Sequence, residues 1–198
     1  MAARPQAVTA LGFLAMTGEQ PCIDAPPFRL RPFADSDIGL IQAASADPHI
    51  TNISTVPTTR DATEARAFIR RQHSRVTNGE GMSFAIARLA DDVAVGYVGL
   101  RYQIDERVSI GYWVGPEHRG EGAAAIALLA LSEWVRAELH IPRLELYVEQ
   151  WNEASIHTAE SAGFLREGLL HSWQRVDGSR RDMWMYSLVD GEPLAGVR

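Results

Sequence analysis

The chain has 198 residues, of which 46% are apolar and 22% are charged. That length and composition predict one globular domain with a sizeable core and exclude a disordered chain. The formal net charge of −6 at pH 7 argues against general nucleic-acid binding, which needs clustered Lys and Arg against phosphate. The one cysteine, Cys22, excludes a disulfide framework, and the six histidines show no metal-ligand spacing, so we expect no metal.

The ends of the chain differ from its middle. Arg4 followed by the apolar run 7–16 faintly resembles a secretory signal, but the run is short and lacks a clear cleavage site. No stretch reaches about 18 apolar residues, so we expect no membrane span and a cytoplasmic protein. We predict a flexible tail over 1–27, a domain over 28–190 and a C-terminal tail over 191–198.

The first predicted elements are a strand and two helices. The run 28–31 alternates apolar and basic residues and indicates a short strand. A helix is predicted over 35–47, opened by capping aspartates and ended before Pro48. A second helix opens at 58–61, buries one apolar side and ends at Asn78-Gly79.

Three strand-like runs then follow closely, at 83–89, 93–102 and 108–114. Short turns at Asp91-Asp92 and at 103–106 separate them. Three such neighbours predict an antiparallel meander, in which each strand pairs with the next.

The last third of the chain alternates between the two kinds of element. A helix is predicted over about 121–140, followed by a strand over 144–148. A short helix over 152–162 comes next, and strands at 164–170 and 183–188 complete the order.

The predicted order is β-α-α-β-β-β-α-β-α-β-β. It indicates an α/β (α+β) fold, with a mixed, mostly antiparallel sheet of seven strands and about four helices. We find no internal repeat and no second domain. The two final strands could pair across a homodimer.

The strand-turn-helix segment at 108–140 carries the chemistry. Its loop holds Arg119, Gly120 and Gly122, and three alanines open the helix. Amides at a helix start have no intrahelical partner, and the helix dipole adds partial positive charge there. Small residues let a phosphate approach, and Arg119 adds charge, so the loop predicts a pyrophosphate site. It is neither a P-loop nor a dinucleotide fingerprint, and alone it also fits a glycine turn entering a helix.

Two motifs at this spacing resemble a known family. Arg119-x-x-Gly122-x-Ala124 resembles the acetyl-CoA motif of the GNAT superfamily, written [RQ]-x-x-G-x-[GA]. The run 110–114 before it, and Asn152-x-x-Ser155-Ile156 with Gly163-Phe164 after it, resemble the RimJ/RimL branch of ribosomal-protein N-terminal acetyltransferases. The resemblance spans roughly residues 28–189, nearly the whole predicted domain.

The resemblance implies that acetyl-CoA binds as cosubstrate between the strands at 108–114 and 144–148, which would splay apart. Backbone groups and Asn152 would bond the pantetheine arm, loop amides would hold the pyrophosphate, and Ser155 would lie near the sulfur. The implied cofactor-binding residues are Trp113, Val114, Arg119, Gly120, Glu121, Gly122, Ala123, Ala124, Asn152 and Ser155.

Ser155 is also the candidate acid for the leaving thiolate. Both Ser155 and Asn152 equally fit structural places at a helix start, Asn152 as an N-cap. The sequence departs from the family at Ala159, where many members have a tyrosine acid, and at Ser109, where the RimJ/RimL branch often has a glutamate. The general base is therefore open between Glu106, Tyr102, Glu145 and a water relay.

These observations predict an N-acyltransferase that moves an acetyl group to a primary amine, with a protein N-terminus as the acceptor that the resemblance implies. Alternatives are a small amine such as an aminoglycoside or polyamine, a donor such as succinyl-CoA, and a non-catalytic acyl-CoA-binding module. We expect the acceptor site around the loops 48–60 and 171–180. The conspicuous residues there are Asp47, His49, Thr51, Trp173, Arg175 and Asp177.

Overall fold

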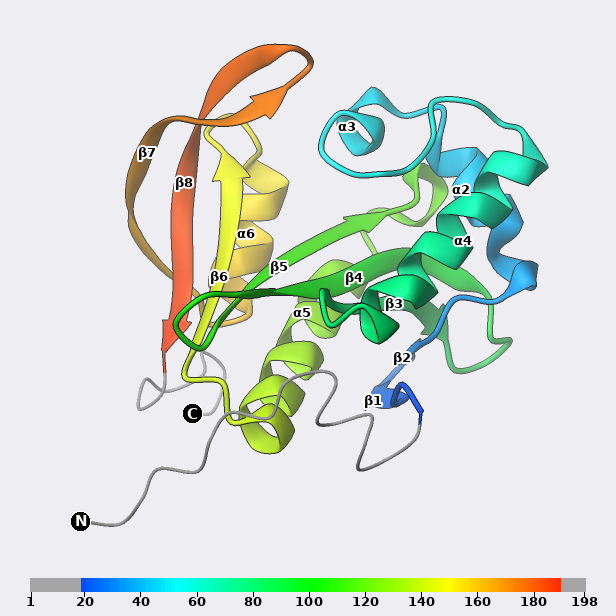
Figure 1. Ribbon diagram of the computed structural model, residues 1–198, viewed down its shortest axis with the longest axis horizontal. Helices are drawn as coiled ribbons and strands as arrows, with labels where there is room; N and C mark the ends of the chain where they lie inside the picture. The colour runs from blue at the N-terminus through cyan, green and yellow to red at the C-terminus, as the bar shows by residue number, and fades with distance from the viewer. Residues whose placement is uncertain (1–18, 190–198) are drawn as a thin grey trace.

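A computed structural model describes residues 19–189, which form an eight-stranded sheet with helices on both faces (Figure 1). The strand order is β1-β2-β3-β4-β5-β6-β8-β7, and every neighbouring pair is antiparallel except β5 and β6. The strands are β1 (Ile23–Ala25), β2 (Phe28–Arg31), β3 (Gly81–Arg88), β4 (Ala94–Gln103), β5 (Arg107–Val114), β6 (Arg143–Glu149), β7 (Leu165–Val176) and β8 (Ser179–Val189).

The helices form two layers. α2 (Ile38–Ala44) and α4 (Ala62–Thr77) pack on one face, whereas α5 (Ala123–Trp134) and α6 (Glu153–Ser161) pack on the other. The four-residue helix α3 (Pro48–Thr51) follows α2. No helix between residues 19 and 189 is long and apolar enough to cross a membrane.

The side-chain alternation of the strands divides the core into two clusters. On β4, Val98 and Leu100 pack in the cluster that includes α5, whereas Tyr97 packs in the cluster beneath α2 and α4. β3 is buried from Gly81 to Ala87, because helices cover both of its faces. The central strands are therefore packed on both faces, and they support the residues of the site.

The parallel pair of strands separates after a short contact. Only Arg107, Val108 and Ser109 of β5 are in register with β6, opposite Arg143 to Glu145. Beyond this point β5 continues beside β4 and β6 continues beside β8. A wedge-shaped opening therefore divides the sheet, as the resemblance implied.

The predicted fold class is confirmed, with two differences near the start of the chain. The sheet has eight strands rather than seven, because Ile23–Ala25, inside the segment predicted as a tail, pairs with β2. The helix predicted over 35–47 is a 3-10 turn, η1 (Asp35–Asp37), followed by α2, which ends at Ala44. Residues 1–18 and 190–198, which hold the rest of the predicted tails, lie outside the described residues.

The later elements also have altered bounds. The helix predicted over 121–140 begins at Ala123 and, after Trp134, continues as a π-helical turn, η3 (Val135–Leu139). The last two strands extend into a long hairpin, with an irregular register around Ser172, whose φ is 51°. β7 is one of the two edge strands of the sheet, and pairing of the final strands across a homodimer stays a prediction.

Candidate active site

The loop between β5 and α5 has free backbone donors and open space in front of them. A 3-10 turn, η2 (Pro116–His118), leads into it, and Gly120 and Gly122 have φ angles of 86° and 75°, which favour glycine. Within residues 19–189, no acceptor pairs with the amides from Arg119 to Ala124. A Cβ added to Gly120 would meet nothing within 4 Å. Such a helix start suits a diphosphate.

The positive charge of Arg119 is already paired. Its guanidinium donates to Asp47, whose carboxylate also caps α3 by accepting from the His49 amide at 2.8 Å. Asp47 is buried, whereas the Arg119 side chain is 48% exposed. The amides and the helix dipole, rather than a free Arg119, therefore provide the attraction for phosphate, and Arg119 ties the loop to α3.

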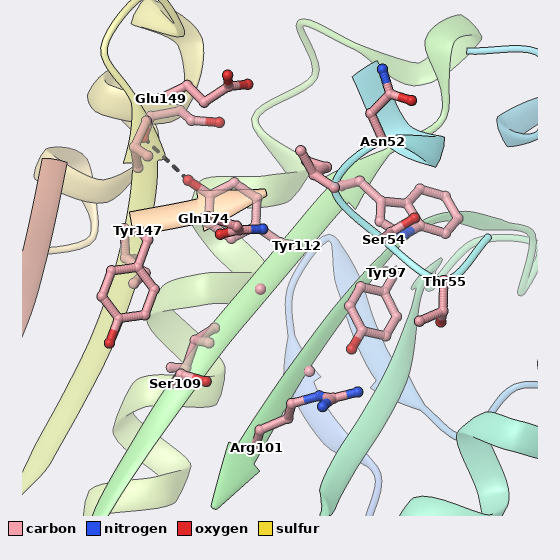
Figure 2. Close-up of a pocket in the computed structure, with 18 of the residues that line it drawn as sticks. Asn52, Ser54, Thr55, Tyr97, Arg101, Ser109, Tyr112, Tyr147, Glu149 and Gln174 are labelled. Atoms are coloured by element: carbon pink, nitrogen blue, oxygen red, sulfur yellow. Dashed lines mark hydrogen bonds between the residues drawn. The ribbon is translucent and has the colours of Figure 1, made fainter. Parts of the chain in front are cut away.

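A cavity of about 490 Å³ opens where β5 and β6 separate. Its walls come from β4, β5, β6 and α4, from residues 52–55 after α3, and from the β7–β8 hairpin. Figure 2 shows Glu149 at one end and Arg101 at the other, with Tyr112 and Tyr97 between them. The fold thus gathers segments that are far apart in the sequence around one space.

β5 presents an unpaired edge to this cavity. Beyond Ser109 it has no strand partner on the β6 side, and the exposed Gly111 would place a Cβ in open space. Trp113 lines the cavity with its ring stacked on Tyr97, at 6.0 Å between ring centroids. Val114, which alternates with Trp113, packs into the α5 core instead. An extended chain could bond to this edge as an added strand.

Asn152 and Ser155 enter the cavity from the start of α6. The Asn152 Oδ1 atom accepts from the Ser155 amide at 3.1 Å, so Asn152 is the N-cap of the helix. Its side-chain nitrogen has no partner within residues 19–189, whereas the Ser155 hydroxyl lies near the Tyr112 hydroxyl. The Tyr112 hydroxyl donates to the Ser155 carbonyl at 3.1 Å (Figure 2), and burial raises the pKa of Tyr112 to about 12. Capping thus leaves the Asn152 side-chain nitrogen free to donate to a ligand.

Comparison with known proteins decides the family. The family described as "Acetyltransferase (GNAT) domain" matches residues 28–165, well over half of the chain.

The chain belongs to the GNAT acetyltransferases.

Individual relatives agree with this assignment. The chain is 30% identical over 149 residues to "Uncharacterized N-acetyltransferase p20" of Bacillus licheniformis, which covers 74% of this chain and 84% of p20. RimJ of Mycobacterium smegmatis, solved with CoA-disulfide, has a TM-score of 0.73 and 23% identity over 86% of both chains. RimL, a ribosomal L7/L12 alpha-N-protein acetyltransferase solved with coenzyme A, has a TM-score of 0.73 and 20% identity over 85% of this chain and 98% of RimL. At these identities the two structures show a shared fold.

Two of the predicted base candidates of this GNAT acetyltransferase lie outside the cavity. Glu106 is exposed in the turn between β4 and β5. Tyr102 points to the opposite face of the sheet, where it packs against the α5 core and burial raises its pKa. A general base must lie within hydrogen-bond reach of the amine, so we retain neither residue.

Glu145, the third candidate, closes the narrow end of the opening. Its fully buried carboxylate accepts from Arg107 at 2.9 Å, from Arg143 at 2.6 Å and from the Tyr147 hydroxyl at 3.0 Å. Burial alone would raise the pKa of Glu145, but the hydrogen bonds from Arg143, Arg107 and Tyr147 outweigh it and lower that pKa. A carboxylate held by two guanidinium groups is a poor proton acceptor, so its role is structural.

Sequence reasoning missed Glu149, the last residue of β6. It lies on the same face as Tyr147 and Glu145, two and four residues before it, and lines the wide part of the cavity. Its side chain is only 12% exposed, and the nearest basic group, Arg181 Nε, is 4.0 Å away. Period-two alternation along β6 is the signal that would have found it.

The residues predicted around the acceptor divide into two groups. Arg175 lines the cavity, and Trp173 packs against Tyr147 there, at 5.4 Å between ring centroids. Asp47 instead holds Arg119, His49 contacts Trp151, and Thr51 donates to the Asp47 carbonyl. Asp177 is exposed in the hairpin turn. The loop after α3 contributes Asn52 to Thr55 to the wall instead.

Proposed function

We propose that this protein transfers an acetyl group from acetyl-CoA to the N-terminal amine of a polypeptide. The observation that carries the proposal is the continuity of three features: the free amides before α5, the unpaired edge of β5, and the cavity at its side. The amides suit the diphosphate of an acyl-CoA, the β5 edge suits its pantetheine arm, and the cavity suits the acceptor. The shared fold with RimJ and RimL supports a polypeptide acceptor.

The residues present fit acetyl-CoA. The amides from Arg119 to Ala124 would hold the diphosphate, and the backbone of β5 near Trp113 and Val114 would bond the pantetheine arm. The free side-chain nitrogen of Asn152 would donate to the same arm. Bound in this way, the cosubstrate supplies an activated thioester next to the acceptor cavity.

Each remaining step has a candidate group of this chain. Glu149 takes the proton that the amine must lose on attack, directly or through a water. Backbone amides along the free edge of β5 stabilise the negative charge that develops on the thioester oxygen. As the carbon–sulfur bond breaks, the Ser155 hydroxyl donates a proton to the thiolate. The product is an amide, and the proton on Glu149 returns through solvent to the Ser155 alkoxide, which restores both groups.

The charges of the cavity disfavour a polycationic acceptor. Arg75, Arg101 and Arg175 line it, against a single acidic side chain, Glu149. An aminoglycoside or polyamine would place several positive charges beside these guanidinium groups, and like charges in a partly buried space repel. A peptide N-terminus brings one amine and no further obligatory charge.

The first experiment is calorimetric titration with acetyl-CoA. Wild type is compared with Gly122→Glu, which puts a carboxylate into the phosphate loop, and with Gly79→Glu as the matched control. Gly79 also has a positive φ, 69°, and open space around its Cβ position, but it follows α4, away from the loop. We expect binding by wild type and Gly79→Glu and none by Gly122→Glu. Absence of binding by folded wild type would contradict the proposal.

A second experiment separates the acceptors. Short peptides with free N-termini are assayed beside spermidine and kanamycin, each with acetyl-CoA and with succinyl-CoA, following the release of free thiol. Turnover of peptides with acetyl-CoA is expected. Turnover of only the small amines would show that the acceptor is a small amine. Turnover with only succinyl-CoA would show that the donor is succinyl-CoA. Binding without any turnover would indicate a non-catalytic module.

A further inference from the structure

Arg75 is a buried cation without a counter-charge. It is 8% exposed and lines the cavity from α4. Its partners are neutral: Nη1 donates to Ser83 Oγ at 3.2 Å and to the Tyr97 hydroxyl at 3.0 Å, and Nη2 donates to Thr55 Oγ1 at 3.5 Å. No carboxylate within residues 19–189 pairs with it. An uncompensated buried charge is costly.

The other well-buried arginine of the described chain shows the contrast. Arg31 is also 8% exposed, but it makes two hydrogen bonds to the carboxylate of Asp37, at 2.8 Å and 2.9 Å, and a third to Asp92. The fold thus supplies carboxylates where a guanidinium group serves structure alone. Arg75 has been left with its charge unmatched, on the wall of the acceptor cavity.

The surroundings fix Arg75 in place. The Tyr97 ring stacks between Phe33 and Trp113, and its hydroxyl lies over Gly99, where a Cβ would come within 2.3 Å of the hydroxyl oxygen. Gly99 therefore makes room for the group that accepts from Arg75. The Tyr97 hydroxyl has no acceptor of its own within residues 19–189. It can donate to a ligand that also contacts the guanidinium group.

Two further cations share this space. Arg101 lines the cavity with no partner within residues 19–189, and Arg175 bonds only to the Gly178 carbonyl, at 3.2 Å. Figure 2 places Arg101 near Tyr97, at the end of the cavity away from Glu149. One end of the cavity therefore carries an acid and the other end carries unpaired positive charge.

We propose that the acceptor carries an anionic group, which Arg75 and Arg101 bind while its amine lies beside Glu149. The inference rests on the proposed function and narrows its substrate class to amines with a carboxylate or phosphate several bonds from the amine. In a peptide this means an acidic or phosphorylated residue close to the N-terminus. A guanidinium group with a spare Nε and a spare Nη2 hydrogen matches both anions in two-point geometry.

The test uses matched hexapeptides with free N-termini and amidated C-termini. One set places a single Glu at each of positions 1 to 4 and compares it with Gln, and a second set compares phosphoserine with serine. At one or more positions we expect wild type to prefer the anionic member by about tenfold or more in kcat/KM. The set that shows the preference identifies the anion. Turnover with no anionic preference at any position would overturn the proposal.

Variants assign the preference to Arg75. Arg75→Gln should reduce the ratio within the best pair to near one. Arg70→Gln is the control, because Arg70 is an exposed arginine of the same helix and should keep the wild-type ratio. Should Arg75→Gln not fold, as judged by circular dichroism, Arg101→Gln replaces it and should lower the ratio severalfold. Retention of the full ratio by the folded variant would overturn the assignment.

A binding experiment separates failure of this inference from failure of the proposed function. The N-acetylated forms of every pair are titrated by calorimetry into protein saturated with coenzyme A. Tighter binding of the anionic product of at least one pair by wild type and Arg70→Gln, but not by Arg75→Gln, supports the anion site even if no amine is turned over. Equal affinities for both products in wild type would overturn it even if acetylation occurs.

Discussion

The narrow end of the β5–β6 opening and the wall of the cavity beside it treat charge in opposite ways. At the narrow end, where the strands are still in register, Arg107 and Arg143 both bond to Glu145, and Arg143 also bonds to Glu167. On the wall of the neighbouring cavity, Arg75 and Arg101 have no carboxylate partner within residues 19–189. The strand junction pairs its charges internally, whereas the cavity wall presents its charges to a ligand.

This difference shows how one strand pair can serve both stability and function. The ion cluster around Glu145 clamps β5 to β6 at the point from which the strands diverge, and it therefore defines the angle of the opening. Buried charges that are fully paired hold a unique geometry but add little net stability. An unpaired buried charge is destabilising until a counter-charge binds to it. Substitutions in the Glu145 cluster and in the cavity test this comparison separately.

The largest expected effect is on chemistry at the wide end. Replacing Glu149 with Gln removes the proposed base, and we expect kcat to fall by about a hundredfold or more. Acetyl-CoA affinity should not change. Steady-state kinetics with a peptide acceptor, beside Glu153→Gln as an exposed control on α6, measure the effect. An unchanged kcat in Glu149→Gln would show that Glu149 is not the base and would favour proton transfer to water.

The next effect is on stability at the narrow end. Glu145→Gln leaves Arg107 and Arg143 without their shared carboxylate, and we expect a loss of about 3 kcal/mol in the free energy of unfolding. Urea denaturation measures it, with Glu133→Gln, an exposed glutamate of α5, expected to stay within about 0.5 kcal/mol of wild type. A loss as small as the control's would show that the cluster does not clamp the strands.

A smaller effect on rate is expected at the start of α6. Ser155→Ala removes the proposed proton donor to the thiolate, and we expect kcat to fall by about tenfold, because a thiolate leaves readily without full protonation. Ser155→Thr should restore most of the rate, since the hydroxyl returns. Equal rates for the Ala and Thr variants would assign Ser155 a purely structural role.

The smallest effect is a dependence of stability on pH. Hydrogen bonds from Arg143 and from Ser187 lower the pKa of Glu167 from 4.5 to about 2. A carboxylate with a lowered pKa contributes stability above pH 4.5, and the contribution is lost as pH falls from 4.5 toward about 2. Because the Glu167 side chain is 41% exposed, we expect less than about 1 kcal/mol. Urea midpoints across this range should fall less in Glu167→Gln than in wild type.

Much of the fold and of the cofactor loop could be predicted from the sequence, because local rules govern both. Gly120, Gly122 and the alanines that follow predict a helix start that is open to phosphate. Short turns between successive strands predict the meander. The acceptor cavity escaped prediction because it is built from distant contacts. Arg75, Ser83 and Tyr97 meet only when α4, β3 and β4 pack together, and nothing in their spacing along the chain shows this.

Asp47 gives the two halves of the site a common thermodynamic link. Its carboxylate fastens the loop that would hold the diphosphate, and it caps the segment whose next residues, Asn52 to Thr55, wall the acceptor cavity. A ligand that draws Arg119 away from Asp47 would alter the support that Asp47 gives to α3 and to the wall segment after it. Coupling of this kind is reciprocal, so each substrate would alter the affinity for the other by the same factor. The affinities for donor and acceptor would thereby be coupled through one buried carboxylate.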